Sequence, residues 1–153
     1  NRLVGIDSFY SSTDNNFFLT GVQMEVGPVA TEFEQEDFGT TLAKCQRYYQ
    51  KWLSDSVGDS VMTAAAISDV AFIGDYFLKT SMRSVPTMGT SGTYKARLKT
   101  NDRAITGQPS INRATTENVQ IFATIATDNN ESGFAGFLKT DDDDAFLEFI
   151  AEL

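Results

Sequence analysis

The sequence has 153 residues, and its 21 acidic side chains outnumber its 12 basic ones to give a formal net charge of −9 at pH 7. A protein of that charge has little with which to neutralise phosphates, so we expect no nucleic-acid partner. The sequence contains no histidine and one cysteine, Cys45, which excludes histidine-dependent nucleophilic catalysis, an intrachain disulfide and multi-cysteine zinc sites. We therefore expect a non-enzymatic protein without a cofactor.

The composition and the spacing of short apolar segments favour an all-β class. Phenylalanine, valine, isoleucine and threonine are frequent, and turn-forming residues separate the segments at short intervals. This pattern predicts an antiparallel β-sandwich or jelly roll with one short α-helix at about residues 40–49. No apolar run approaches the roughly 20 residues that span a membrane, so we expect no membrane insertion.

Residues 1–27 predict a β-hairpin. Apolar and polar residues alternate over 17–26, and Gly27-Pro28 ends this strand because proline cannot donate to a sheet ladder. Two alternatives remain open. The hairpin is either the end of a preceding β-sandwich domain, with 28–37 as a linker, or part of the same stack of sheets as the C-terminal β-sandwich domain, 38–153.

The hydrophobic period becomes helical after the linker. Leu42, Cys45, Tyr49 and Trp52 recur at spacings of three, four and three residues, which is typical of one face of an amphipathic helix. We expect this helix, roughly Thr40 to Tyr49, to pack its apolar face on the β domain. Cys45 would then be a small buried hydrophobic residue.

Strand patterns follow the helix along the rest of the chain. They cover residues 61–67, 70–79, 84–89, 93–100, 117–127, 134–140 and 145–153. Pro86 places its strand at a sheet edge or at a bulge. The clearest strand is 117–127, in which Val119, Ile121, Ala123 and Ile125 line one face. The polar segment 101–112 is predicted to be a long loop.

One run of the sequence resembles a known family. Residues 20–51 read TGVQMEVGPVATEFEQEDFGTTLAKCQRYYQK, which is similar over 32 residues to the TGVQLEVG…ATPFE…YG.EL..CQRYYQK segment of bacteriophage tail-fibre and related appendage proteins. Met82–Thr87 and Phe149–Leu153 also resemble strands of that family. The chain departs from the family at Glu32, where proline is common, and at Gln35-Glu36, where His-Arg is usual.

The resemblance implies a virion structural protein, located at the distal end of a tail fibre or appendage. It also implies a homotrimer that contacts other virion proteins, but it does not identify a receptor or ligand. Our own expectation for the role of such a domain is attachment to a host-surface glycan. A trimer would bury an apolar sheet face of each chain, such as the small-residue strand Met62 to Ala66, and the sequence leaves open which face this is. A capsid decoration or cement protein is the alternative, and a polysaccharide depolymerase is less favoured because no pair of carboxylates is singled out.

Aromatic residues beside polar loops are the usual surface on which proteins bind sugars. The candidate ligand-binding residues are Tyr10, Tyr94, Arg97, Asn112, Asn129 and Asn130. The run Asp141, Asp142, Asp143 and Asp144 is a candidate calcium site because Ca²⁺ binds about six to eight oxygen ligands. This run lacks the spacing of an EF-hand loop, and we favour a solvated hairpin tip over a metal site.

Overall fold

A computed structural model describes residues 16, 18–29, 31–126 and 132–151. The chain forms two compact units, Asn1–Glu36 and Asp37–Leu153. The described part of the second unit contains one helix, α1 (Phe38–Gln46), followed by nine strands. The strands are β1 (Tyr49–Leu53), β2 (Ser60–Ala66), β3 (Ala71–Phe77), β4 (Thr87–Ser91), β5 (Tyr94–Leu98), β6 (Asn101–Ala114), β7 (Asn118–Ile125), β8 (Ala135–Thr140) and β9 (Phe146–Ile150).

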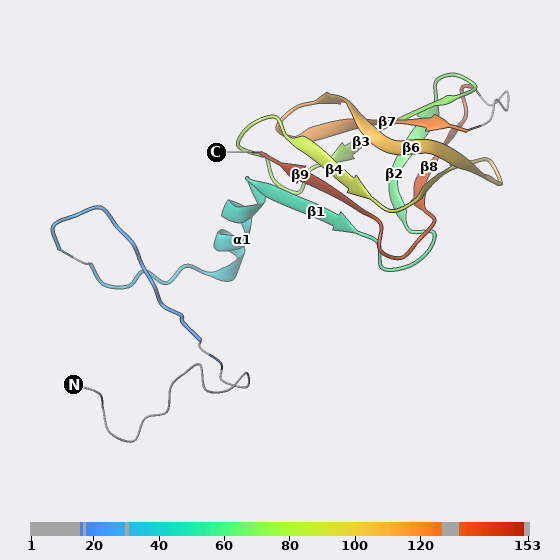
Figure 1. The fold of residues 1–153 in the computed structure, drawn as a ribbon. Helices are drawn as coiled ribbons and strands as arrows, with labels where there is room; N and C mark the ends of the chain where they lie inside the picture. Colours follow the sequence, from blue (N-terminus) through green and yellow to red (C-terminus); the bar gives the residue numbers. More distant parts are fainter. Residues whose placement is uncertain (1–15, 17, 30, 127–131, 152–153) are drawn as a thin grey trace. The chain divides into compact units, whose positions relative to one another are not determined.

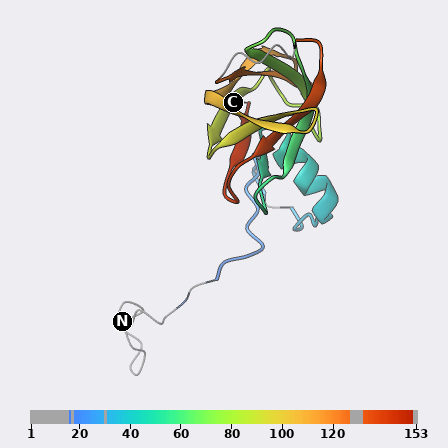
Figure 2. The same cartoon turned by 90° about the vertical axis from the view of Figure 1, so that its right-hand side faces the viewer.

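Six of these strands close into an antiparallel barrel in the order β2-β3-β7-β6-β5-β8, with β8 pairing back to β2 (Figure 2). The other three form a small antiparallel sheet in which β9 lies between β1 and β4 (Figure 1). The predicted antiparallel β class with one short helix is therefore confirmed. The described strands do not form two open sheets, however, because six of them pair around a closed ring.

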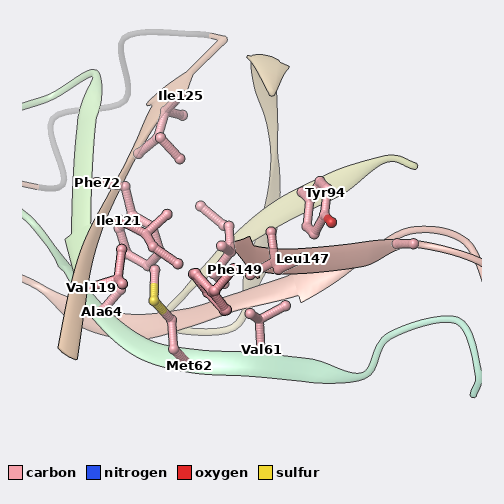
Figure 3. Packing of buried hydrophobic residues seen from close by; sticks show 14 of the residues in the cluster. Val61, Met62, Ala64, Phe72, Tyr94, Val119, Ile121, Ile125, Leu147 and Phe149 are labelled. Carbon is pink, nitrogen blue, oxygen red and sulfur yellow. The ribbon is translucent and has the colours of Figure 1, made fainter. Parts of the chain in front are cut away.

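The core lies inside the barrel and under the three-stranded sheet (Figure 3). Alternate side chains of β7 point inward, and these are the four residues that the sequence predicted, each at most 2% exposed: Val119, Ile121, Ala123 and Ile125. From β9, Leu147 and Phe149 join the same cluster. The ring of Tyr76 from β3 stacks on Phe149 with centroids 4.9 Å apart. One face of the small sheet is thus part of the barrel core.

Gly136 allows two barrel strands to approach closely. It lies on β8 opposite Leu98 of β5, and a Cβ atom at this position would lie only 1.9 Å from the carbonyl oxygen of Arg97. No side-chain rotation relieves a clash with backbone. A residue larger than glycine would therefore push β8 away from β5 and open the barrel at this seam.

The predicted loop at 101–112 is wrong, because these residues belong to β6, the longest strand. Most polar residues of β6 are exposed, whereas Ile105 and Ile111 pack against the core. The Gly107 to Pro109 segment, which favoured a loop, coincides with a register shift between Thr106 and Ser110. A bulge absorbs these residues without ending the strand.

The strand Met62 to Ala66 offers no free apolar face for a trimer contact. Within β2, Met62, Ala64 and Ala66 are buried in the barrel core, whereas Thr63 is exposed. The small residues therefore match the narrow interior of the barrel. The inward face of this strand is therefore not available for a trimer contact, and the homotrimer itself stays a prediction.

The strand expected over 17–26 is not formed by its described residues, 18–26. A strand needs a partner to bond its backbone, and the expected partner lies in residues 1–10, outside the described part of the chain. Hydrogen bonds instead close a loop in this unit: Thr31 donates its hydroxyl to Glu25 at 2.7 Å, and the Glu34 N–H donates to the Gln23 side chain at 2.8 Å. The bonds from Thr31 lower the pKa of Glu25.

Asp37 caps the helix α1, which ends earlier than predicted. The prediction that Cys45 and the apolar helical face are buried is wrong, because Cys45 is exposed and no residue of α1 is buried. The Asp37 carboxylate accepts hydrogen bonds from the N–H groups of Gly39 and Thr40, which is the usual chemistry of an N-cap. The helix stops at Gln46, so Tyr49 and Trp52 belong to β1. A spacing of three residues places two side chains on one helical face but on opposite faces of a strand.

A polar cluster holds the loop between β1 and β2. The buried hydroxyl of Ser54 lies 3.1 Å from that of Thr140 at the end of β8. Beside it, one Asp59 oxygen accepts from the N–H groups of Asp55 at 2.9 Å and Ser56 at 3.0 Å. These backbone donors lower the pKa of Asp59. The Asp59 contacts therefore stabilise the loop most strongly when the carboxylate is charged.

We predict that Phe149→Ala lowers the free energy of unfolding by about 3–5 kcal/mol, because it removes a fully buried ring and leaves a cavity. Urea denaturation followed by circular dichroism measures this loss. Phe137→Ala is the matched control, since Phe137 lies on β8 and is 47% exposed. Its cost should be about 1 kcal/mol or less. Equal losses in the two variants would contradict the assignment of Phe149 to the core.

We predict that Asp59→Asn destabilises the protein at neutral pH and much less in acid. A carboxyl group whose folded pKa lies below its ordinary 3.8 stabilises the fold above that value, and the stabilisation disappears as the pH falls through the folded pKa. The wild type should therefore lose its advantage over the variant below about pH 4. Denaturant titrations from neutral pH to acid test this.

Asp144→Asn removes one charge from the exposed turn between β8 and β9 and serves as the control. The same pH dependence in both variants would show that general acid destabilisation, rather than the Asp59 contacts, causes the effect.

Candidate functional site

Tyr94 lies in the core and not on a ligand surface. It is 4% exposed, and its hydroxyl lies 2.7 Å from the carbonyl oxygen of Phe146 and 3.0 Å from that of Ser91. Burial, together with the nearby charge of Asp142, raises the pKa of Tyr94 well above its ordinary value. Its phenol ties β5 to the three-stranded sheet, and its ring is not accessible to a sugar.

The structure does not bring the other predicted ligand residues together. Arg97 on β5 forms an ion pair of 3.2 Å with Asp102 at the start of β6. Asn112 lies ten residues further along β6 and donates to Gln120 at 2.8 Å. The remaining candidates, Tyr10, Asn129 and Asn130, lie outside the described residues.

The aspartate run forms a turn that is attached to β5. Asp142 accepts hydrogen bonds from the backbone N–H of Thr93 at 2.6 Å and from its hydroxyl at 2.8 Å. Asp141 pairs with the ammonium group of Lys95 at 2.5 Å. Among the described residues no group of three or more His, Cys, Asp or Glu side chains is placed to hold a metal ion. Two of the four carboxylates thus serve the fold.

The candidate site is the outward face of the three-stranded sheet, which carries aromatic and charged side chains next to one another. In register across β1 and β9, Tyr49 pairs with Ile150, Lys51 with Glu148, and Leu53 with Phe146. These six residues alternate with the buried Gln50, Leu147 and Phe149 and therefore share the opposite, solvent-facing side. We call them the outer sheet face.

Two contacts between strands organise the outer sheet face. The Tyr49 hydroxyl donates to Oε2 of Glu148 at 2.9 Å. The ammonium group of Lys51 lies 3.9 Å from the centroid of the Phe146 ring. Each contact joins β1 to β9, so the two aromatic rings and the two charges are held in a fixed arrangement.

Gly89 provides space for the Glu148 carboxylate. It lies on β4 directly opposite Glu148, and a Cβ atom there would lie 2.6 Å from Oε1 and 2.9 Å from Cγ of the glutamate. The glutamate side chain therefore leans over the bare backbone of β4. Gly89 acts as a positioning residue, because any side chain at this place would displace the carboxylate.

Electrostatics keep the Tyr49 phenol protonated. Partial desolvation raises its pKa, and both the hydrogen bond to Glu148 and the glutamate charge raise it further. The Tyr49 residue nevertheless remains 45% exposed. The outer sheet face therefore offers an accessible aromatic ring next to a carboxylate and an ammonium group, which suits a ligand with both apolar C–H faces and hydroxyl groups.

Sequence reasoning misses this site because the helical spacing extends to Tyr49. The available signal is the alternation of Tyr49, Lys51 and Leu53 against Gln50 and Trp52, which has the period of a strand.

Comparison of the chain with family models, curated proteins and solved structures found no match. In the described part of the chain, α1 is too short and too polar to cross a membrane.

We predict that Glu148→Gln lowers the pKa of Tyr49 part of the way towards its ordinary value of 10.0. The substitution removes the charge that disfavours the phenolate but keeps the partial desolvation of the ring. Tyr76 is an internal control, because only burial raises its pKa. Titration of a sample with ¹³C-labelled tyrosine, followed by nuclear magnetic resonance, measures the pKa values of Tyr49 and Tyr76 separately. If the pKa of Tyr49 does not change in the variant, or the pKa of Tyr76 changes equally, the pairing of Tyr49 with Glu148 is incorrect.

Proposed function

We propose that this chain is a virion structural module, the distal domain of a phage tail fibre or appendage, which attaches as a homotrimer to a host-surface glycan. The glycan-binding part of the proposal rests on one observation at the outer sheet face: the exposed Tyr49 is held beside Glu148 by a hydrogen bond. The virion and appendage assignment is supported by the resemblance of residues 20–51 and remains a proposal.

A pyranose has an apolar C–H face and a rim of hydroxyl groups. In the proposed complex the C–H face packs on Tyr49, and the hydroxyls meet the charged groups beside it. Glu148 accepts from Tyr49 through Oε2, which leaves Oε1 to accept from a sugar hydroxyl. Lys51 is close enough to the same surface to donate to another hydroxyl.

The net charge narrows the class of glycan. A chain with a formal charge of −9 repels polyanionic capsules, and Glu148 adds a negative charge at the site itself. We therefore propose an uncharged hexose-containing glycan as the ligand. Binding to it should depend little on salt concentration, because few ions are released.

We predict that Tyr49→Ala and Glu148→Gln each weaken glycan binding by about tenfold or more, which corresponds to about 1.4 kcal/mol. Gly89→Ala should also weaken it, because the added methyl group displaces the carboxylate without removing it. A glycan array identifies a ligand, and isothermal titration calorimetry then gives the affinities.

Phe137→Ala is the control, since it removes an exposed aromatic ring from the barrel strand β8 and should bind like the wild type. Circular dichroism confirms that each variant is folded. Unchanged affinity in all three site variants would refute the outer sheet face as the site. Binding of sialylated or uronic-acid glycans alone would refute the proposed ligand class.

A further inference from the structure

Lys51 and Glu148 carry opposite charges on the outer sheet face but do not neutralise each other. They lie directly opposite on β1 and β9, where the Cβ atoms of paired residues are about 4.5–5.5 Å apart. Opposite charges in such positions attract each other across the strands. Among the described residues, however, the ion pairs involve barrel strand β5, and none joins Lys51 to Glu148.

Other contacts hold the two charged groups apart. The Glu148 side chain leans over Gly89 on β4, the strand on the side away from β1. Its Oε2 atom accepts from the Tyr49 hydroxyl at 2.9 Å. The Lys51 ammonium lies 3.9 Å from the centroid of the Phe146 ring, which belongs to the next outward-facing residue pair along the sheet. Each charge thus has its own aromatic neighbour.

The two groups have opposite and fixed hydrogen-bonding roles. An ammonium group only donates, and an ionised carboxylate only accepts. Oε2 of Glu148 is used by Tyr49, so Oε1 keeps its capacity to accept. Lys51 has three N–H donors, and those that point away from the Phe146 ring can bond a ligand. A ligand group that satisfies both charges must therefore donate at one end and accept at the other.

A secondary amide meets this requirement within one rigid group. In its trans form the N–H and the C=O point in opposite directions, so the N–H can donate to Glu148 while the carbonyl oxygen accepts from Lys51. A hydroxyl group that bonds either charge leaves its remaining hydrogen-bonding capacity to water. The amide thus gains two charge-assisted hydrogen bonds, which are stronger than neutral ones.

An acetamido substituent also carries a methyl group, and the outer sheet face has apolar side chains beside the two charges. Leu53 is 52% exposed, and Phe146 and Ile150 are partly exposed on the same side of the sheet. The Tyr49 ring remains the surface for the C–H face of the sugar. Each part of an acetamido sugar therefore has a chemical counterpart on this face.

We propose that the outer sheet face recognises an N-acetylhexosamine, with the acetamido group bridging Lys51 and Glu148. The inference rests on the proposed glycan-binding function and names the class of sugar that the same site takes. Lys51 determines the specificity in this complex, whereas Tyr49 supplies contacts that any hexose can make.

The test compares sugars that differ only in this group. Tri-N-acetylchitotriose and cellotriose have the same linkage, and the methyl glycosides of N-acetylgalactosamine and galactose form a second pair. Isothermal titration calorimetry of the full chain should give an affinity about tenfold or more higher for the acetamido member of at least one pair.

Equal affinities within each pair that binds overturn the inference and leave glycan attachment standing. Binding only to glycans that lack an acetamido group has the same meaning. Failure to bind any glycan on an array overturns both the inference and the proposed attachment function.

Lys51→Met separates recognition of the amide from general sugar binding. Methionine keeps an unbranched apolar side chain beside Phe146 but removes the ammonium donor, so the preference for the acetamido sugar should fall several-fold. Lys99→Met is the matched control, because the Lys99 ammonium lies 3.8 Å from the Phe134 ring centroid, outside the outer sheet face. Circular dichroism confirms that both variants are folded. A preference that survives Lys51→Met, or that Lys99→Met reduces equally, overturns the inference.

Discussion

The packing of Leu147 and Phe149 against the barrel interior fixes the position of the whole three-stranded sheet. Both side chains are fully buried, and β9 carries them at the centre of that sheet, between β1 and β4. Because side chains alternate along a strand, the same packing forces Phe146 and Glu148 to the opposite side. The geometry of the outer sheet face is thus set by the core beneath it. If this surface binds a ligand as proposed, its side chains would lose little conformational freedom, because the packed core already restricts the strand that carries them.

The sequence predicted strands well where hydrophobic alternation was strong and failed where a bulge or a change of period intervened. The β7 residues Val119 to Ile125 alternate without interruption, and their buried face was predicted correctly. In β6 the glycine and proline at 107 and 109 suggested a loop, because a turn and a bulge have the same residue preferences. Only the pairing of β6 with its neighbours, which depends on distant residues, decides between them.

The outer sheet face escaped prediction for a related reason. The spacing of Leu42, Cys45, Tyr49 and Trp52 fits one continuous helix, but the chain leaves the helix after Gln46. The helix is short because Tyr49 to Leu53 gains a complete antiparallel pairing with β9, and the buried Gln50 side chain adds three hydrogen bonds. Such tertiary pairing outweighs the weak helical preference of the sequence. The pairing partner lies about a hundred residues away, so the short alternation of Tyr49, Lys51 and Leu53 does not by itself outweigh the helical spacing.

Closure of the barrel also limits which strand edges are open to pair with other protein molecules. Around that ring, every described strand has neighbours on both sides, and unsaturated strand edges are confined to the five-residue β1 and β4. Pro86 immediately precedes β4 and cannot donate a backbone hydrogen bond, while Lys51 places a charge in the middle of β1. Short edges of this kind, which a proline and a charge interrupt, are poor templates for the edge-to-edge strand pairing that builds fibrils. Among the described strands, only these two edges could extend a sheet into a neighbouring molecule.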